Sequence, residues 1–218
     1  MQVFDRSSVE SAIRDGQMEF SECDFTDVDL SGLDASDVHF SNCSMTGADL
    51  RSAILCNGVW VGCKGERTSL LAADCSDTKF SRCNFANTNW RGARLSSASF
   101  EDCKLTGANF SEARMLGVKF EHCLLVSAVL RGLSFRKQKL NGLDFSGADL
   151  AGADFRDSVL LDCRLRGASL RGAMLQHADL RGCDIGNFTL SDAQILRGAI
   201  ISSTQATELL RSLDIQVA

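Results

Sequence analysis

The sequence has no long apolar run, and none of its segments approaches the roughly 18 apolar residues that a membrane-spanning helix needs. Its first residues, MQVFDRSSVESAIRDG, also lack the basic start and the apolar centre of a secretory signal peptide. These absences disfavour a membrane protein and an exported precursor. We therefore expect a cytoplasmic, soluble chain without a membrane partner.

Basic residues are missing from the segment between Asp15 and Leu50, which holds nine acidic residues and no Lys or Arg. Lys and Arg gather later, in the stretch RKQK and in many Arg-Gly pairs. A protein that binds nucleic acid directly usually presents one clustered basic face. The charge distribution therefore disfavours direct nucleic-acid binding, although it is compatible with a partner that itself binds DNA.

Closely spaced metal ligands and catalytic motifs are also missing. None of the ten cysteines forms a C-x2-C pair of the kind that zinc sites use. The three histidines, His39, His122 and His177, are scattered, and there is no Gly-rich phosphate loop or nucleophile elbow. We therefore expect no enzymatic activity, no cofactor and no metal.

A repeat of five residues is what the sequence does have. Every fifth residue from Phe20 to Ile200 gives 37 positions, of which 27 are Phe or Leu, with no slip of phase. Two residues earlier the set is mostly small, with Ala or Cys at 22 of the 37 positions. Because a period of five fits neither a helix nor an alternating strand, it predicts a turn in every repeat.

This pattern resembles the pentapeptide repeat family, and GADLAGADF at 147–155 follows the family's A(D/N)LXX repeat closely. The resemblance covers about 180 of the 218 residues. It implies an all-β fold, a right-handed quadrilateral parallel β-helix in which four repeats make one coil. The 37 repeats then give about nine coils.

The cysteine spacing agrees with a coil of twenty residues. Eight cysteines lie at multiples of twenty from Cys23, and Leu143 takes the one skipped place. They are Cys23, Cys43, Cys63, Cys83, Cys103, Cys123, Cys163 and Cys183. All take the small inward position, so we interpret them as a packing ladder inside one face rather than as metal or disulfide sites.

Two positions break the pattern. Gly65 stands where a large residue is expected and should leave the core underfilled, and Gln138 stands where a small apolar residue is expected. Both are candidate bulges with polar side chains turned outward, either as local irregularities or as a protrusion that contacts a partner.

The two ends are predicted to be helical caps, because an open coil exposes unpaired strand edges. We expect an N-terminal cap at 1–17, with a capping box of Ser7 and Glu10, and the β-helix at 18–202. A C-terminal helix and tail follow at 203–218, with a capping box of Ser202 and Gln205.

Function is suggested by two parts of the chain. The tail resembles that of the Qnr-like and albicidin-resistance-like branch of the family, which implies a homodimer through its apolar residues. These are Ala206, Leu209, Leu210, Leu213, Ile215 and Val217. The resemblance also implies a DNA mimic that binds DNA gyrase or topoisomerase IV and protects it from quinolones or natural poisons. The acidic surface expected to meet that enzyme comprises Glu19, Glu22, Asp24, Asp27, Asp29, Asp34, Asp37 and Asp49.

A second hypothesis stays open at this point. Most pentapeptide arrays have no known role, and the repeat itself says nothing of the target. The chain is then a non-catalytic scaffold for interactions with another protein. The modest net charge of −5 and the scattered arginines favour this alternative.

Overall fold

The computed structural model describes residues 1–186, 194–211 and 215. It divides into two compact units, unit 1 (Met1–Leu124) and unit 2 (Leu125–Ala218), which are described separately below. Both units are built from parallel coils, and the fold is an all-parallel β-solenoid of about eight turns with a short C-terminal helix. The fold class predicted from the repeat is confirmed. The ninth predicted coil would include residues 187–193, which lie outside the described part.

The backbone explains why the repeat has five residues. Large inward residues donate their N–H to a carbonyl of the next coil, as Phe25 does to Ser44 at 2.8 Å and Leu30 to Asp49 at 2.7 Å. Two residues later the chain turns through the left-handed region, for example at Asp27 with φ 57° and Gly47 with φ 70°. Gly, Asn and Asp adopt this conformation most readily, which accounts for their frequency at that position.

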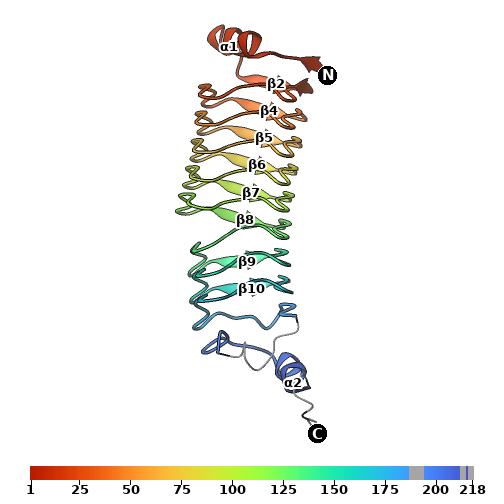
Figure 1. The fold of residues 1–218 in the computed structure, drawn as a ribbon, viewed down its shortest axis with the longest axis vertical. Helices are drawn as coiled ribbons and strands as arrows, with labels where there is room; N and C mark the ends of the chain where they lie inside the picture. Colours follow the sequence, from red (N-terminus) through yellow and green to blue (C-terminus); the bar gives the residue numbers. More distant parts are fainter. Residues whose placement is uncertain (187–193, 212–214, 216–218) are drawn as a thin grey trace. The chain divides into compact units, whose positions relative to one another are not determined.

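Unit 1 contains a parallel sheet whose strands each come from a different coil (Figure 1). The strands are β2 (Glu19–Ser21), β4 (His39–Ser41), β5 (Val59–Val61), β6 (Lys79–Ser81), β7 (Ser99–Glu101) and β8 (Lys119–Glu121). Phe20 pairs with Phe40, Phe40 with Trp60, and Phe80 with Phe100. This register of twenty residues confirms the coil length that the cysteines predict.

The core of unit 1 is a stack of aromatic rings. The Phe100 ring lies 4.8 Å from that of Phe80, nearly parallel at 7°, and 5.1 Å from that of Phe120. Trp60 and Trp90 are fully buried in the same core. Parallel rings on successive coils bury large apolar areas without changing the register of the strands.

The cysteine ladder is buried and unbridged, as the packing interpretation predicts. Its thiols also bond to the backbone, since Cys83 Sγ donates to the carbonyl oxygen of Trp60 at 3.4 Å and Cys123 Sγ to that of Phe100 at 3.4 Å. Burial also raises the pKa of the Cys75 thiol, a buried cysteine outside the ladder. A buried protonated thiol is a poor nucleophile, so Cys75 serves the core.

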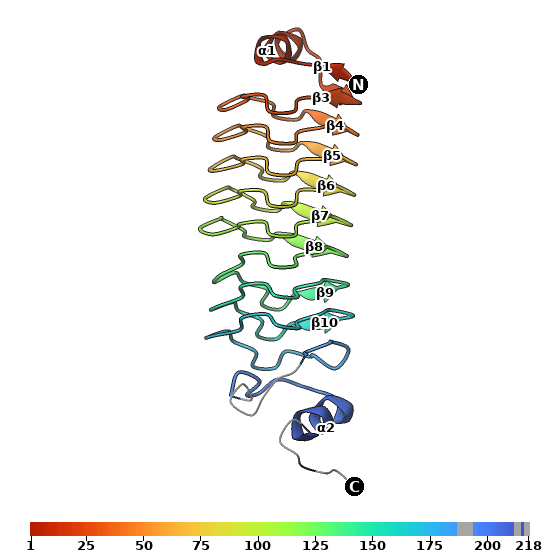
Figure 2. The ribbon, with the colours of Figure 1, turned by 45° about the vertical axis from the view of Figure 1, so that its right-hand side comes forward.

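The N-terminus covers the first coil with a strand and a helix (Figure 2). Strand β1 (Gln2–Val3) pairs in parallel with β3 (Cys23–Asp24), and helix α1 (Arg6–Arg14) follows. The predicted capping box of Ser7 and Glu10 is wrong. Asp5 is the N-cap and exchanges hydrogen bonds with Ser8, because the helix begins two residues earlier than the Ser7 assignment requires.

Gly65 does not leave the core underfilled, contrary to the prediction. A Cβ atom at this position would overlap the ring of Phe85, the equivalent residue of the next coil. The backbone bonds of the coil are regular, and Glu66 accepts hydrogen bonds from Thr46 Oγ1 at 3.2 Å and from Asn84 Nδ2 at 2.5 Å. The segment is therefore no bulge, and Gly65 provides space for a ring.

Unit 2 continues the same construction with strands β9 (Lys139–Asn141) and β10 (Val159–Leu161), which pair twenty residues apart. Gln138 is half-buried, and its amide donates to the Ser134 carbonyl at 3.5 Å. Its own carbonyl accepts the N–H of Val159 at 2.9 Å, so the ladder continues past it. The prediction of a bulge is wrong here as well.

The repeat phase slips in the last part of unit 2, where the sequence predicted none. Asp179 pairs with Ile200, which is 21 residues away instead of 20. Ile200 therefore takes the outward place opposite Asp179 and is 46% exposed. Helix α2 (Ser203–Arg211) then begins with the predicted capping box, because Ser202 and Gln205 exchange hydrogen bonds at 2.7 and 3.2 Å.

Candidate functional site

The acidic residues of the first coils have a structural role before any binding role. Asp24 Oδ1 accepts the backbone N–H of Thr26 at 2.9 Å, and Asp29 Oδ1 accepts that of Ser31 at 2.9 Å. Asp34 and Asp49 bond in the same way to the residues two places ahead. Each of these carboxylates closes its own turn, which is a local motif that Asp and Asn share.

These turn bonds keep the carboxylates ionised. Bonds from the side chain and backbone of Thr26 lower the pKa of Asp24, and those from Ser31 and Ser36 lower the pKa of Asp29 and Asp34 in the same way. A hydrogen bond to the charged form of an acid favours that form. The turns therefore hold their negative charges across the whole neutral range.

Three further acidic residues occupy left-handed turn positions, Glu22 with φ 54°, Asp27 with φ 57° and Asp37 with φ 62°. Asp suits this conformation, whereas a longer side chain such as Glu gains nothing from it. Glu19 lies on β2 and is exposed. The charges of Glu19 and Glu22 therefore have no explanation in the backbone.

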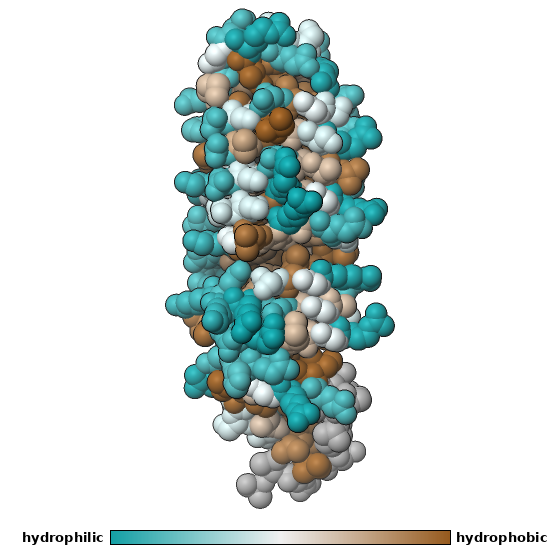
Figure 3. All heavy atoms as spheres, turned by 90° about the vertical axis from the view of Figure 1, so that its left-hand side faces the viewer, coloured by the Kyte–Doolittle hydropathy of each residue, from teal (hydrophilic) through white to brown (hydrophobic). Residues whose placement is uncertain are grey.

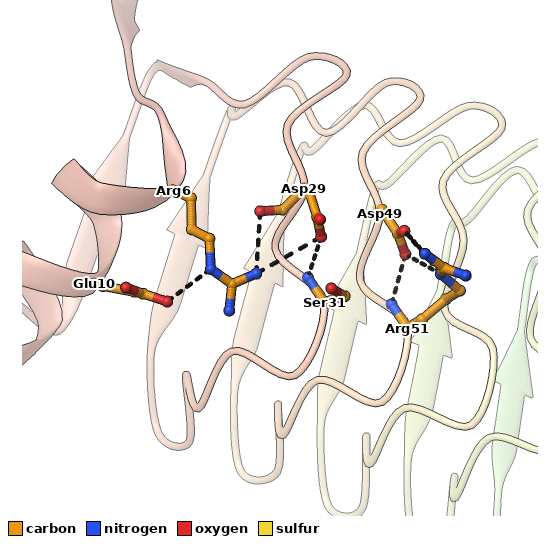
Figure 4. A network of polar contacts seen from close by, with 6 residues as sticks. All are labelled: Arg6, Glu10, Asp29, Ser31, Asp49 and Arg51. Atoms are coloured by element: carbon orange, nitrogen blue, oxygen red, sulfur yellow. Dashed lines mark hydrogen bonds and ion pairs between the residues drawn. The ribbon is translucent and has the colours of Figure 1, made fainter.

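Two of the predicted acidic residues are paired with arginines, which the sequence interpretation missed (Figure 4). Arg6 of α1 bonds to Glu10 at 2.8 Å and reaches Asp29 with its Nη1 atom 3.6 Å from Oδ1. Arg51 pairs with Asp49 at 2.6 Å. The Arg6–Glu10 pair is visible in the sequence as a helical i,i+4 spacing, but the reach to Asp29 depends on where α1 docks.

The other six acidic residues, Glu19, Glu22, Asp24, Asp27, Asp34 and Asp37, have no ion pair among the described residues. A coil has four sides of five residues each, so the side that holds Asp29 and Asp49 is opposite the side that holds β2. The six unpaired acids lie on the β2 side and on the two sides next to it. The predicted surface therefore divides into three acidic sides and one neutralised side.

An open groove of about 490 Å³ lies between α1 and the first coil of unit 1. Glu10, Ile13 and Arg14 line it from the helix, and Leu33 and Asp34 line it from the coil. The groove contains side chains of both charges as well as apolar ones, so it is not a uniformly acidic pocket.

The predicted dimerisation residues lie on and after α2. Leu210 is 37% exposed and Ile215 is 46% exposed, while Ala206 and Leu209 are half-buried. Leu213 and Val217 lie outside the described residues. The described part of α2 thus presents some apolar surface, although the partner of that surface stays a prediction.

The remaining surface is mainly hydrophilic on the face in Figure 3, where hydrophobic side chains form small separate groups. Leu116 of unit 1 is the most exposed large apolar side chain in the described residues, at 84%. No three His, Cys, Asp or Glu side chains of the described residues gather as metal ligands would. No helix in the described ranges is long and apolar enough to cross a membrane.

Two family models match the chain. The model described as pentapeptide repeat region matches residues 34–110 and 73–150, and the model described as pentapeptide repeats (8 copies) matches residues 148–187. No curated protein matches the sequence.

Solved structures of QnrB1 share the fold. Trypsin-treated QnrB1, described as a plasmid-mediated fluoroquinolone resistance protein, is 20% identical, with 92% of this chain and 90% of that one covered and a TM-score of 0.56. Full-length QnrB1 is 19% identical, with 98% and 95% covered and a TM-score of 0.52. HetL from the cyanobacterium Nostoc sp. strain PCC 7120 is 20% identical over 91% of both chains, with a TM-score of 0.44. The family models span most of the sequence and agree with the coils described above, and the chain therefore belongs to the pentapeptide repeat family.

Proposed function

We propose that this protein is a DNA mimic that binds a type II topoisomerase, DNA gyrase or topoisomerase IV, and protects it from quinolones or natural poisons. The observation that carries the proposal is the uneven charge. Residues 1–50 hold eleven acidic and two basic residues, a net charge of −9, whereas residues 51–218 have a net charge of +4. DNA carries a dense row of negative charges, so enzymes that bind it present basic channels.

The arrangement of the unpaired acids supports this use. A basic channel encloses its ligand from more than one side, and the six unpaired acids cover three adjacent sides of the first coils. The fourth side, which carries the Asp29–Arg6 and Asp49–Arg51 pairs, would face away from the channel. Charge complementarity of this kind mainly speeds and orients the encounter.

The similarity to QnrB1 adds support from the fold, because that protein is described as a fluoroquinolone resistance protein. We further propose that the chain forms a homodimer through Ala206, Leu209, Leu210, Leu213, Ile215 and Val217. Such an interface would be isologous, which is the commonest arrangement in oligomers. The protein acts in the cytoplasm in this proposal and has no catalytic role.

The test is a supercoiling assay with purified gyrase, and a decatenation assay with topoisomerase IV. Each is run with a quinolone and with a natural topoisomerase poison over a wide range of protein concentrations. We expect activity to recover as this protein is added. If there is neither rescue nor inhibition at any concentration, the alternative function as a protein-interaction scaffold with another target replaces this proposal.

The charge hypothesis has its own matched variants. Asp24→Asn and Asp34→Asn remove charge but keep the turn acceptor, as Asn84 and Asn89 already do in this chain. Combined with Glu19→Gln and Glu22→Gln, they should raise the concentration of this protein that is needed to protect the topoisomerase roughly tenfold at low salt.

The control combines Asp29→Asn and Asp49→Asn, which remove two charges from the neutralised side and should change protection little. The matched comparison is with Asp24→Asn and Asp34→Asn alone, which also remove two charges. Equal effects of these two pairs would contradict the assignment of the three acidic sides.

A further inference from the structure

The last described coil of unit 2 ends on carbonyl groups that a following coil would normally satisfy. In the earlier coils of unit 2 the carbonyl of the ladder residue accepts a backbone N–H from 21 residues ahead, as Leu143 does from Arg164 at 2.9 Å and Cys163 does from Asp184 at 3.0 Å. The carbonyl of the large residue on the strand side accepts a thiol from 23 residues ahead, as Leu140 does from Cys163 at 3.7 Å and Leu160 does from Cys183 at 3.5 Å. The equivalent carbonyls of the last coil are those of Cys183 and Leu180.

Gln205 replaces both donors with one side chain. Its Nε2 atom donates to the Leu180 carbonyl at 2.8 Å and to the Cys183 carbonyl at 2.8 Å. Its Oε1 atom accepts the N–H of Ser202 at 2.7 Å, so both the nitrogen and the oxygen of the amide form hydrogen bonds. Only 6% of the residue is exposed, although it is polar and lies on a helix of nine residues.

We propose that Gln205 is the positioning residue that ends the solenoid, because its amide supplies the two hydrogen bonds of an absent next coil and thereby fixes α2 against unit 2. The orientation of Leu209 and Leu210 relative to the coil then depends on this one amide. The consequence for a second copy of the chain rests on the proposed homodimer, whereas the docking of α2 does not.

Chemistry at this position is restrictive. Glutamate has nearly the same shape but offers a carboxylate to two carbonyl oxygens, and leucine offers no donor at all. Either change removes both side-chain donors, so the Cys183 carbonyl loses the Gln205 bond and the Leu180 carbonyl keeps only the N–H of Cys183 at 2.9 Å. Losing these bonds is costly in a site closed to water. The loss of stability should be confined to the end of unit 2, since the two bonds hold no other element.

The first experiment is hydrogen exchange on the full chain, comparing Gln205→Leu and Gln205→Glu with the wild type. We expect amide exchange in α2 to be about tenfold or more faster in both variants. Thr204→Ala is the matched control, because Thr204 is exposed on the same helix, and it should leave exchange unchanged. Unchanged α2 exchange in both Gln205 variants would overturn the proposal.

Two further measurements separate the docking of α2 from the folding of unit 1 and from the proposed homodimer. Both tryptophans lie in unit 1, so their fluorescence monitors whether that unit remains folded in each variant. The midpoint of unfolding measured by this fluorescence should not change. Analytical ultracentrifugation then measures the oligomeric state. A monomeric wild type with faster α2 exchange in the variants would refute the homodimer and support the docking role of Gln205.

Discussion

Unit 1 and unit 2 follow the same five-residue repeat but fill it differently. In unit 1 the strand-side column holds Phe20, Phe40, Trp60, Phe80, Phe100 and Phe120, whereas in unit 2 it holds Leu140, Leu160 and Leu180. The net charge is −6 in unit 1 and +1 in unit 2. The repeat therefore fixes where a side chain lies and how the backbone turns, while the number of aromatic rings and the surface charge differ between the units.

The two ends differ in the same sense. Unit 1 is closed by a strand, β1, which adds a normal backbone pair to β3. Unit 2 is closed by a side chain, the amide of Gln205. The strand and the side chain each provide hydrogen-bond partners for backbone groups that an end coil would leave unpaired, as any solenoid end requires.

The largest effect should come from filling the space that Gly65 leaves for the aromatic core of unit 1. Gly65→Leu forces a branched side chain into the Phe85 ring, and overpacking of this kind costs about 1–3 kcal/mol. Urea unfolding monitored by tryptophan fluorescence reports on this unit. The double variant Gly65→Leu with Phe85→Leu should recover at least half of the loss, and no recovery would mean that the two positions do not share one space.

A smaller effect on stability is expected from removing one aromatic ring from a stack. Phe100→Leu removes two near-parallel partners, Phe80 and Phe120, and should cost about 1–2 kcal/mol. Phe155→Leu in unit 2 removes one stacked partner, Phe135 at 4.9 Å, and should cost about half as much. Hydrogen exchange measured in both units checks this order, and a larger loss for Phe155→Leu would reverse the comparison.

The smallest effect concerns pH. Bonds from Arg156 lower the pKa of Asp154 in unit 2, and bonds from Ser36 lower the pKa of Asp34 in unit 1. A carboxylate with a depressed folded pKa stabilises the protein above its unfolded pKa of about 3.9, and that contribution is lost as pH falls through the folded value.

Asp154→Asn and Asp34→Asn should each flatten the loss of stability below about pH 4, because the unfolded pKa lies near there. The change should be larger for Asp154, which also pairs with Arg156 at 2.7 Å and is less exposed. Unfolding at neutral and acidic pH, followed by hydrogen exchange in each unit, gives the measurement. An unaltered acid dependence in both variants would show that these turns do not govern it.

The sequence predicted those features that the repeat itself encodes. The coil length followed from the cysteines at steps of twenty, and the small inward position of Cys83 or Cys123 followed from the phase. The capping box of Ser202 and Gln205 was also predicted, because it is a local motif that depends on a spacing of three residues.

Features that depend on contacts between coils or on docking could not be predicted in this way. Gly65 seemed to leave a hole because the rotamer of Phe85, twenty residues away, is not visible in the sequence. The neutralisation of Asp29 depends on the docking of α1, which brings Arg6 to it. The exposure of Ile200 follows from one additional residue between the paired positions Asp179 and Ile200, which the regular five-residue count conceals.

The turn formed by Asp24, Asp29 and Asp34 has a consequence for how such a surface can change over time. Asn closes the same turn at Asn84, Asn89 and Asn109 with the same acceptor atom. Asp and Asn codons differ by a single nucleotide, so each turn can gain or lose a charge without disturbing the coil beneath it. The solenoid thus provides a row of positions where selection can adjust electrostatics one charge at a time while folding stays constant.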